Sequence, residues 1–315
     1  MKIPLKNGLI LLTAATIWGT AFVAQSVGMD YMGPLTFNGL RYFLGAAVLC
    51  PFLLLKRRRD PEPVSAEGVL PGTGEAGTRA RKIQAAGIAD RTRVNRALKG
   101  GFFCGLFLCL ASNLQQFAIL SVDVGKAGFL TAMYIVIVPV LAFFLTGRTS
   151  LRLWISVALA AAGLYFLSIS GGMRLQAGDL ALICCAFVFS LHIMCIDRFS
   201  DVDGVALSCL QFIVAGLLSM GAALIWETVT FSSVRAGWFP LVYAGVFSCG
   251  IAYTFQILGQ KGVDPAVASL ILSLESVVSV LAGFVLLGQA LSARELLGCV
   301  LMFAAIVLVQ LPEKS

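Results

Sequence analysis

The stretch NLQQFAILSVDVGKAGFLTAMYIVIVPVLAFFLTG (residues 113–147) has a diverged second copy in TFQILGQKGVDPAVASLILSLESVVSVLAGFVLLG (residues 254–288). An offset of 141 residues aligns identical residues at eight of the 35 positions, including Gln115 with Gln256. Apolar composition alone produces several matches of this kind, so the polar pairs carry more weight. The two copies indicate that the chain contains an internal repeat.

The composition around these copies excludes a soluble fold. The 315 residues are 59% hydrophobic and 12% charged, with a mean hydropathy of +0.92. A soluble protein of this size keeps more polar residues on its exterior, whereas lipid accepts an apolar one. A membrane helix needs about 20 apolar residues to cross the hydrocarbon layer. The sequence predicts ten such helices, near residues 8–25, 36–55, 100–120, 126–146, 152–170, 178–196, 204–224, 238–257, 267–288 and 293–311.

The ten segments divide into two sets of five. Because five crossings reverse the direction of the chain, the second repeat has the opposite orientation in the membrane. We therefore predict an all-α integral membrane protein with ten transmembrane helices in two inverted repeats. The first repeat is residues 1–170 and the second is residues 171–315. Inverted repeats of this kind hold a substrate site between them, near the middle of the bilayer.

The distribution of basic residues predicts the orientation of the chain. Of the 23 Lys and Arg residues, 18 fall on the side of the N-terminus and four on the opposite side. Cytoplasmic loops carry an excess of Lys and Arg, so both termini are expected in the cytoplasm of a multi-pass cell-membrane protein. Eleven of the basic residues lie in 56–99, which has no aromatic residue and contains three prolines. We predict that 56–99 is a flexible cytoplasmic loop. No nucleic-acid partner is expected.

The nine cysteines lie inside apolar segments, and their number and spacing suit neither a disulfide framework nor a metal site. No Walker loop for ATP is present. We expect no cofactor, no metal and no catalytic residue.

Several segments resemble the drug/metabolite transporter superfamily, specifically its EamA-like ten-helix branch. The similarity lies in IWGTAF at 17–22, GLRYFLG at 39–45, AGFLT at 127–131 with Tyr134, and AVASLILSLE at 266–275. It extends over the chain outside 56–99. The resemblance implies a secondary transporter, with a cavity lined by the first, third, fourth, sixth, eighth and ninth helices.

Arg41 and Glu275 are the two clearest cases of a charged residue inside a predicted membrane helix. A charge at the bilayer centre costs at least about 2.5–3.5 kcal/mol, so it persists when it is paired, hydrated or used in function. Glu275 lies deeper in its helix, and three roles suit it: binding a substrate amine, carrying a coupling proton, or joining neighbouring helices. Arg41 lies near the end of its segment, where a long side chain reaches the interface. We interpret Arg41 as a structural charge.

Other polar and aromatic residues are candidates for a binding site. In the third segment, Cys109, Ser112, Asn113 and Gln116 share one helical face and are placed along a cavity. The amides equally suit helix–helix hydrogen bonds. The same alternative of inter-helix packing applies to Trp18, and a structural role is favoured for the single histidine. The remaining candidates for substrate binding or coupling are Thr131, Tyr134, His192, Tyr253 and Gln256.

The hypothesis that accounts for these features is a secondary transporter of small metabolites or drugs across the cytoplasmic membrane. It works by alternating access, and export driven by a proton or solute gradient is the expected direction. Its partners are a small-molecule solute (metabolite, amino acid or drug-like) and the lipid bilayer, and the sequence leaves a homodimer open. A non-transporting scaffold or lipid-handling protein is the alternative. An intramembrane enzyme is less favoured, because one deep acid and one histidine supply no catalytic pair.

Overall fold

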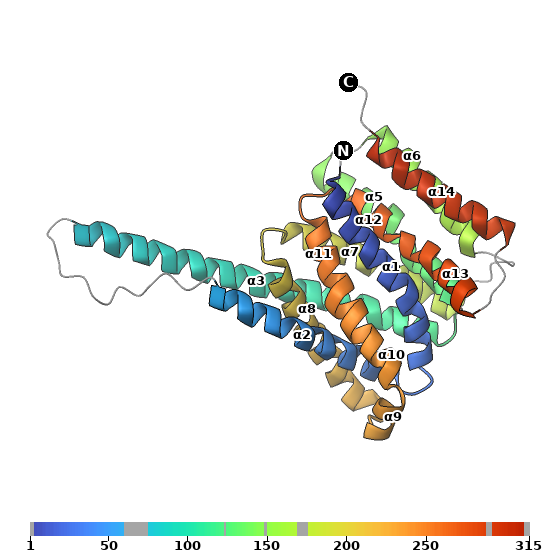
Figure 1. Cartoon of the computed structure of the whole chain (residues 1–315), viewed down its shortest axis with the longest axis horizontal. Coiled ribbons are helices and arrows are strands. Elements are labelled where there is room, and N and C mark those ends of the chain that lie inside the picture. Colours follow the sequence, from blue (N-terminus) through green and yellow to red (C-terminus); the bar gives the residue numbers. More distant parts are fainter. Residues whose placement is uncertain are drawn as a thin grey trace.

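The computed structural model describes residues 3–59, 75–122, 124–147, 150–168, 176–287 and 292–311, and all regular structure in these ranges is helical (Figure 1). The elements are α1 (Leu5–Gly28), α2 (Pro34–Arg59), α3 (Glu75–Ile119), α4 (Val124–Ala132), α5 (Tyr134–Thr146), α6 (Leu151–Ser168), α7 (Ala177–Arg198), α8 (Gly204–Trp226), α9 (Phe231–Ala236), α10 (Trp238–Val242), the π-helix η1 (Tyr243–Tyr253), α11 (Thr254–Gln260), α12 (Pro265–Leu272), α13 (Leu274–Leu287) and α14 (Ala293–Gln310).

These helices confirm the predicted all-α membrane fold. Within the described residues, eight helices or continuous helix runs are long and apolar enough to cross a bilayer, and Leu151–Phe166 is a shorter apolar helix. Each of the ten predicted segments coincides with helix: α4–α5, α10–η1–α11 and α12–α13 each correspond to one segment, and α14 to the last. Outward-facing Leu5, Phe144 and Trp226 are 79%, 79% and 73% exposed. Such an apolar exterior is stable in lipid and unstable in water.

Packing between the halves follows the order expected of two inverted repeats. Helix α2 packs on its counterpart α8, and α6 packs on its counterpart α14. The contact of α3 with α7 has its equivalent in the contact of η1 and α11 with α1. The contact of α1 with α12 and α13 has its equivalent in that of α7 with α4 and α5. The predicted boundary near residue 170 lies outside the described residues, so the division into 1–170 and 171–315 stays a prediction.

The predicted flexible loop over 56–99 is wrong for most of its length. Residues 56–59 continue α2, and residues 75–99 form the first part of the 45-residue helix α3, which extends beyond the bundle in Figure 1. Residues 60–74 lie outside the described part of the chain. The physical reason is helix propagation: residues 75–99 contain no proline and are rich in Ala and Arg, which are strong helix formers. Once the apolar part of α3 is helical, each added residue extends an existing helix, so the cost of nucleation is not repeated.

Two of the long helix runs are interrupted near their middle. The first is interrupted between α4 and α5 at Met133, and the second between α12 and α13 at Ser273. With the offset of 141 residues, these interruptions fall within one residue of equivalent positions in the two copies. Transporters with inverted repeats use interrupted helices of this kind to bring helix ends and polar groups to a central site.

Two apolar clusters surround the region where the interrupted helices meet. The larger cluster joins α1, α4–α7 and α12–α14, with Ile135 and Leu272 fully buried within it. The other joins α2, α3, α8 and η1 around Phe212. Trp18 and Phe189 pack against both clusters, so the polar side chains between them are held by well-packed walls.

Candidate functional site

A pocket lies between the two apolar clusters, and its centre is a hydrogen bond between Tyr134 and Glu275. The Tyr134 hydroxyl donates to Glu275 Oε1 at 3.0 Å, and both side chains are buried, with 4% and 5% exposed. The offset of 141 residues that aligns the two copies also aligns these two positions. The pair therefore joins equivalent points of the two halves.

The interrupted helices place this pair. Tyr134 is the first residue of α5, and Glu275 is in the first turn of α13. A carboxylate in the first turn of a helix interacts favourably with the positive end of the helix dipole. Helix α1 comes close to α13 at this level because Gly19 has no side chain: a Cβ there would lie 2.6 Å from the carbonyl oxygen of Glu275.

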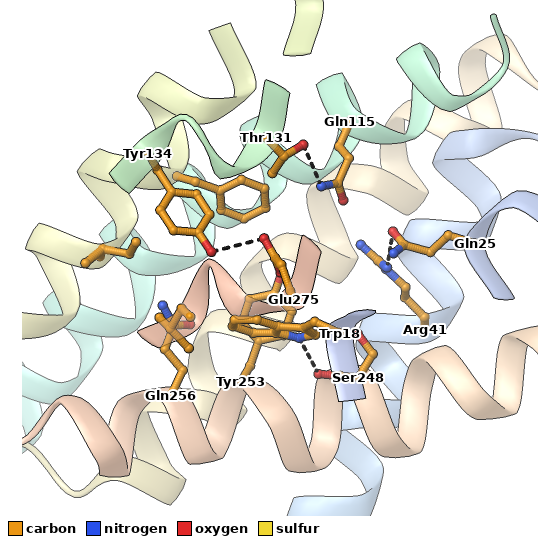
Figure 2. A pocket seen from close by; sticks show the side chains of 13 residues that line it. Trp18, Gln25, Arg41, Gln115, Thr131, Tyr134, Ser248, Tyr253, Gln256 and Glu275 are labelled. Atoms are coloured by element: carbon orange, nitrogen blue, oxygen red, sulfur yellow. Dashed lines mark hydrogen bonds between the residues drawn. The ribbon is translucent and has the colours of Figure 1, made fainter. Parts of the chain in front are cut away.

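One wall of the pocket is aromatic. The rings of Trp18 and Tyr253 meet edge to face, with centroids 4.7 Å apart. The Trp18 indole Nε1 donates to the carbonyl oxygen of Ser248 at 3.3 Å, which fixes the plane of the ring (Figure 2). Ser248 and Tyr253 both belong to η1, and π-helical turns are frequent at functional sites. An amphipathic aromatic wall of this kind packs against a flat or apolar part of a ligand.

Amides and a guanidinium form the polar part of the lining. Gln115 Nε2 donates to Thr131 Oγ1 at 3.2 Å, and Arg41 Nη1 donates to Gln25 Oε1 at 2.8 Å. Figure 2 shows the Arg41–Gln25 pair on one side of the pocket and the Tyr134–Glu275 pair on another. The full lining comprises Trp18, Gln25, Arg41, Gln115, Thr131, Tyr134, Phe189, Ile193, Ser248, Tyr253, Gln256, Leu272 and Glu275.

The pocket is narrow in this conformation. Its empty volume is ≈ 490 Å³, of which ≈ 40 Å³ admits the centre of a water molecule. A larger solute needs the surrounding helices to separate.

Six of the predicted candidates line this pocket: Trp18, Thr131, Tyr134, Tyr253, Gln256 and Glu275. The structure places Asn113, Gln116 and His192 elsewhere. Asn113 Nδ2 donates to Ser219 Oγ at 2.8 Å, and Gln116 Nε2 donates to the carbonyl oxygen of Gln25 at 3.1 Å. His192 is fully buried, with Nε2 3.0 Å from Gln211 Oε1.

The helical face of α3 that carries Asn113 and Gln116 therefore contacts α1, α2 and α8. The face with Gln115, one residue away, points into the pocket. The interpretation that Arg41 reaches the membrane interface is wrong, because its side chain is 1% exposed and lines the pocket. Its guanidinium carbon lies over the rings of Tyr42 and Phe37. Whether this charge is structural stays a prediction.

Sequence reasoning did not select Gln25, Gln115, Ser248, Phe189, Ile193 and Leu272, which complete the lining. Gln25 carried a weak signal, since it is a polar residue in the last turn of an otherwise apolar helix. Gln115 is one of the identities that align the two copies, opposite Gln256. That identity was a sign that both glutamines lie near the contact between the repeats.

An all-helical membrane bundle with two interrupted helices that meet at a buried polar pocket is the arrangement of a membrane transporter. The profile of the EamA-like transporter family matches residues 6–169 and again residues 176–311. The chain belongs to this family, and it is a multi-pass membrane protein.

Curated relatives agree with this assignment. The chain is 25% identical over 303 residues to an uncharacterized transporter of Archaeoglobus fulgidus, with 96% of this chain and 84% of that protein covered. It is 24% identical to the uncharacterized inner membrane transporter YedA of Escherichia coli, covering 94% of this chain and 87% of YedA. A solved crystal structure, 19% identical and covering 96% of each chain, shares the fold with a TM-score of 0.72.

Proposed function

We propose that this protein is a secondary transporter that moves a small solute through the central pocket by alternating access. The observation that carries the proposal is the Tyr134–Glu275 hydrogen bond, which joins equivalent positions of the two halves inside a pocket lined by polar and aromatic side chains. When the halves rock against each other, such a pair is at the pivot. Both termini are placed in the cytoplasm, as the distribution of basic residues favours.

Polar contacts between the halves at both ends of the bundle support this mechanism. At one end, Lys126 Nζ lies 2.7 Å from Asp179 Oδ2. At the other end, the Arg96 guanidinium pairs with Asp201, with Nη2 2.7 Å from Oδ1. Asp179 is the third residue of α7 and Asp201 lies three residues after its end, so about 19 residues of helical rise separate them, roughly 28 Å at 1.5 Å per residue. Opening one ion pair while the other stays closed gives the pocket access to one side at a time.

A second link closes the end where Lys126 lies. Glu227, directly after α8, accepts hydrogen bonds from the backbone N–H groups of Leu35 and Thr36, both at 2.8 Å. It thereby caps the N-terminus of α2 with a carboxylate from the other half, an arrangement that the helix dipole favours. At the opposite end, Asn7 Nδ2 donates to the carbonyl oxygens of Gly259 and Lys261, each at 3.0 Å.

Within this mechanism, Glu275 is the residue that we propose for coupling. It is the one acid among the described residues that line the pocket, and these residues place no cation within ion-pair distance of it. A carboxyl that is buried without a cation changes its solvation strongly when it gains or loses a proton. Proton exchange there would couple flux to a pH gradient. Export is part of the proposal and rests on the family resemblance.

The experiment is solute counterflow in proteoliposomes, screened over amino acids, nucleosides and amphipathic amines, with and without a pH step. The wild-type protein should exchange at least one of these solutes faster than empty liposomes. Glu275→Gln should keep expression and exchange but lose the dependence on the pH step. Asp30→Asn, the same acid-to-amide change at an exposed position between α1 and α2, should keep it. Absence of exchange for every solute class would reject transport, and an unchanged pH response in Glu275→Gln would reject the coupling role.

A further inference from the structure

The Arg41 guanidinium is a buried charge that lacks an acidic partner. Its side chain is 1% exposed, and it lines the central pocket. Nη1 donates to Gln25 Oε1 at 2.8 Å, Nη2 donates to the Tyr42 hydroxyl at 3.3 Å, and Nε has no partner. Among the residues that the structure describes, no carboxylate oxygen lies within 4.0 Å of this guanidinium.

These neutral contacts leave the positive charge uncompensated. Two aromatic rings lie near it, with the Tyr42 and Phe37 centroids 5.1 and 5.9 Å from the guanidinium carbon. Cation–π contacts stabilise a cation, but they do not neutralise it. Taking an ion out of water carries a large desolvation penalty that a counter-ion with good geometry offsets. The empty position beside Arg41 is therefore suited to an anion from outside the protein.

The geometry of the donors suits an anion that presents two oxygen atoms, as a carboxylate does. An arginine has five N–H donors in a rigid planar fork, which matches the two oxygens of a carboxylate. Gln25 holds Nη1, and this hydrogen bond fixes the plane of the fork from a neighbouring helix. Nε has no partner and Nη2 carries a second hydrogen, so donors remain for a contact with an incoming anion. Gln25 and Arg41 come from α1 and α2, so the fork is positioned by two helices.

We propose that Arg41, positioned by Gln25, is the anion-binding subsite of the pocket and takes a carboxylate of the transported solute. The rest of the solute then lies toward the Trp18–Tyr253 wall, which suits an apolar or aromatic body (Figure 2). This inference rests on the proposed transport function, because it names the chemistry of the solute that the same pocket carries.

Three probes with one phenyl ring and one chain length test the subsite directly: 3-phenylpropanoate, its neutral amide 3-phenylpropanamide, and the cation 3-phenylpropylammonium. Binding is measured by titration calorimetry on the purified protein in nanodiscs, with empty nanodiscs correcting for partition into lipid. The wild-type protein should bind the carboxylate at least about tenfold more tightly than the amide, a difference of about 1.4 kcal/mol. Equal binding of the carboxylate and the amide would overturn the proposal.

Variants then test whether the preference for the carboxylate over the amide depends on Arg41. Arg41→Gln should bind the carboxylate and the amide equally. Arg235→Gln, the same change on the exposed helix α9, should keep the wild-type preference. Retention of the preference in Arg41→Gln would overturn the proposal. If that variant does not fold, Arg41→Lys keeps the charge but loses the planar fork, and it should reduce the preference without removing it. A full wild-type preference in Arg41→Lys would contradict the bidentate contact.

The binding result is separable from the transport result. A carboxylate preference that depends on Arg41, in a protein without counterflow, would support the subsite and reject transport. Counterflow of a solute in a protein that binds the carboxylate and amide probes equally would support transport and reject the subsite.

Discussion

The close contact between α1 and α13 predicts a large difference between two glycine-to-alanine substitutions on one helix. At Gly19, a Cβ would lie 2.6 Å from the carbonyl oxygen of Glu275 and 2.6 Å from Val278 Cβ. At Gly8, eleven residues earlier in α1, the nearest atom would be 4.0 Å away, an ordinary van der Waals contact. The two substitutions therefore add the same methyl group to a crowded site and to an open one.

The expected magnitude follows from these distances. An ordinary contact begins near 3.4 Å, so Gly19→Ala requires α1 and α13 to separate by about 0.8 Å. A gap of 0.5–1 Å forfeits about a quarter to a half of each dispersion contact along the interface. Overpacking of this kind typically costs about 1–3 kcal/mol. Gly8→Ala lacks this penalty and gains up to about 1 kcal/mol, because alanine favours the helix more than glycine does. The same gain in helix propensity applies to Gly19→Ala, so the two variants should differ by the overpacking penalty of about 1–3 kcal/mol.

The assay is reversible unfolding in mixed micelles, with the free energy of unfolding taken from the denaturant midpoint and slope for both variants and the wild type. Gly19→Ala should be less stable than the wild-type protein, and Gly8→Ala equally or more stable. Because Gly19 contacts α13 beside Glu275, counterflow should fall in Gly19→Ala and persist in Gly8→Ala. Equal stability of the two variants would refute the close approach of α1 to α13.

Two further predictions concern the ion pairs between the halves. Lys126→Met leaves the buried Asp179 carboxylate without its cation and should destabilise the protein by about 1.5–3 kcal/mol, the range for hydrogen bonds to charged groups. A double-mutant cycle with Asp179→Asn measures the coupling energy between the two residues, and additive effects on stability would contradict the pairing. Hydrogen bonds from Arg96 hold the pKa of Asp201 below its ordinary value, so the stability that this pair contributes is fully present above about pH 4 and is lost as the pH falls through the lowered pKa. The difference in melting temperature between wild type and Asp201→Asn should therefore stay constant from about pH 8 to 5 and narrow only in stronger acid; a difference that narrows between pH 8 and 5 would contradict this assignment.

The fold could be predicted from the sequence because the bilayer sets the length of each apolar segment. The 21-residue run Lys126–Thr146, for example, has the length and hydropathy of a span whether or not it is interrupted. The interruption at Met133 carries no comparable signal, since no glycine or proline lies at that position. The helical start of α3 at Glu75 was missed because a charged, solvent-facing helix and an irregular basic loop have similar compositions.

The site could be predicted in part, and the reason is visible on α3. Asn113, Gln115 and Gln116 lie within four residues, and successive residues of a helix point about 100° apart. Only the packing of neighbouring helices decides which of them faces a cavity. Helical spacing favoured the face with Asn113, whereas contacts with α2 and α8 occupy that face. The hydrogen bond of Tyr134 to Glu275 could not be predicted from the alignment of the two copies, because the two aligned residues are not identical.

The central claim is that the pocket opens to each side of the membrane in turn, and thiol accessibility tests it without a known solute. In a variant without native cysteines, Ser248→Cys places one thiol in the pocket lining, and Ser219→Cys places one in the packed contact between α3 and α8. A membrane-impermeant methanethiosulfonate reagent is added to right-side-out and to inverted vesicles. Ser248→Cys should react from both sides, and Ser219→Cys from neither. Reaction of Ser248→Cys from one side alone, or no faster than Ser219→Cys, would contradict alternating access through this pocket.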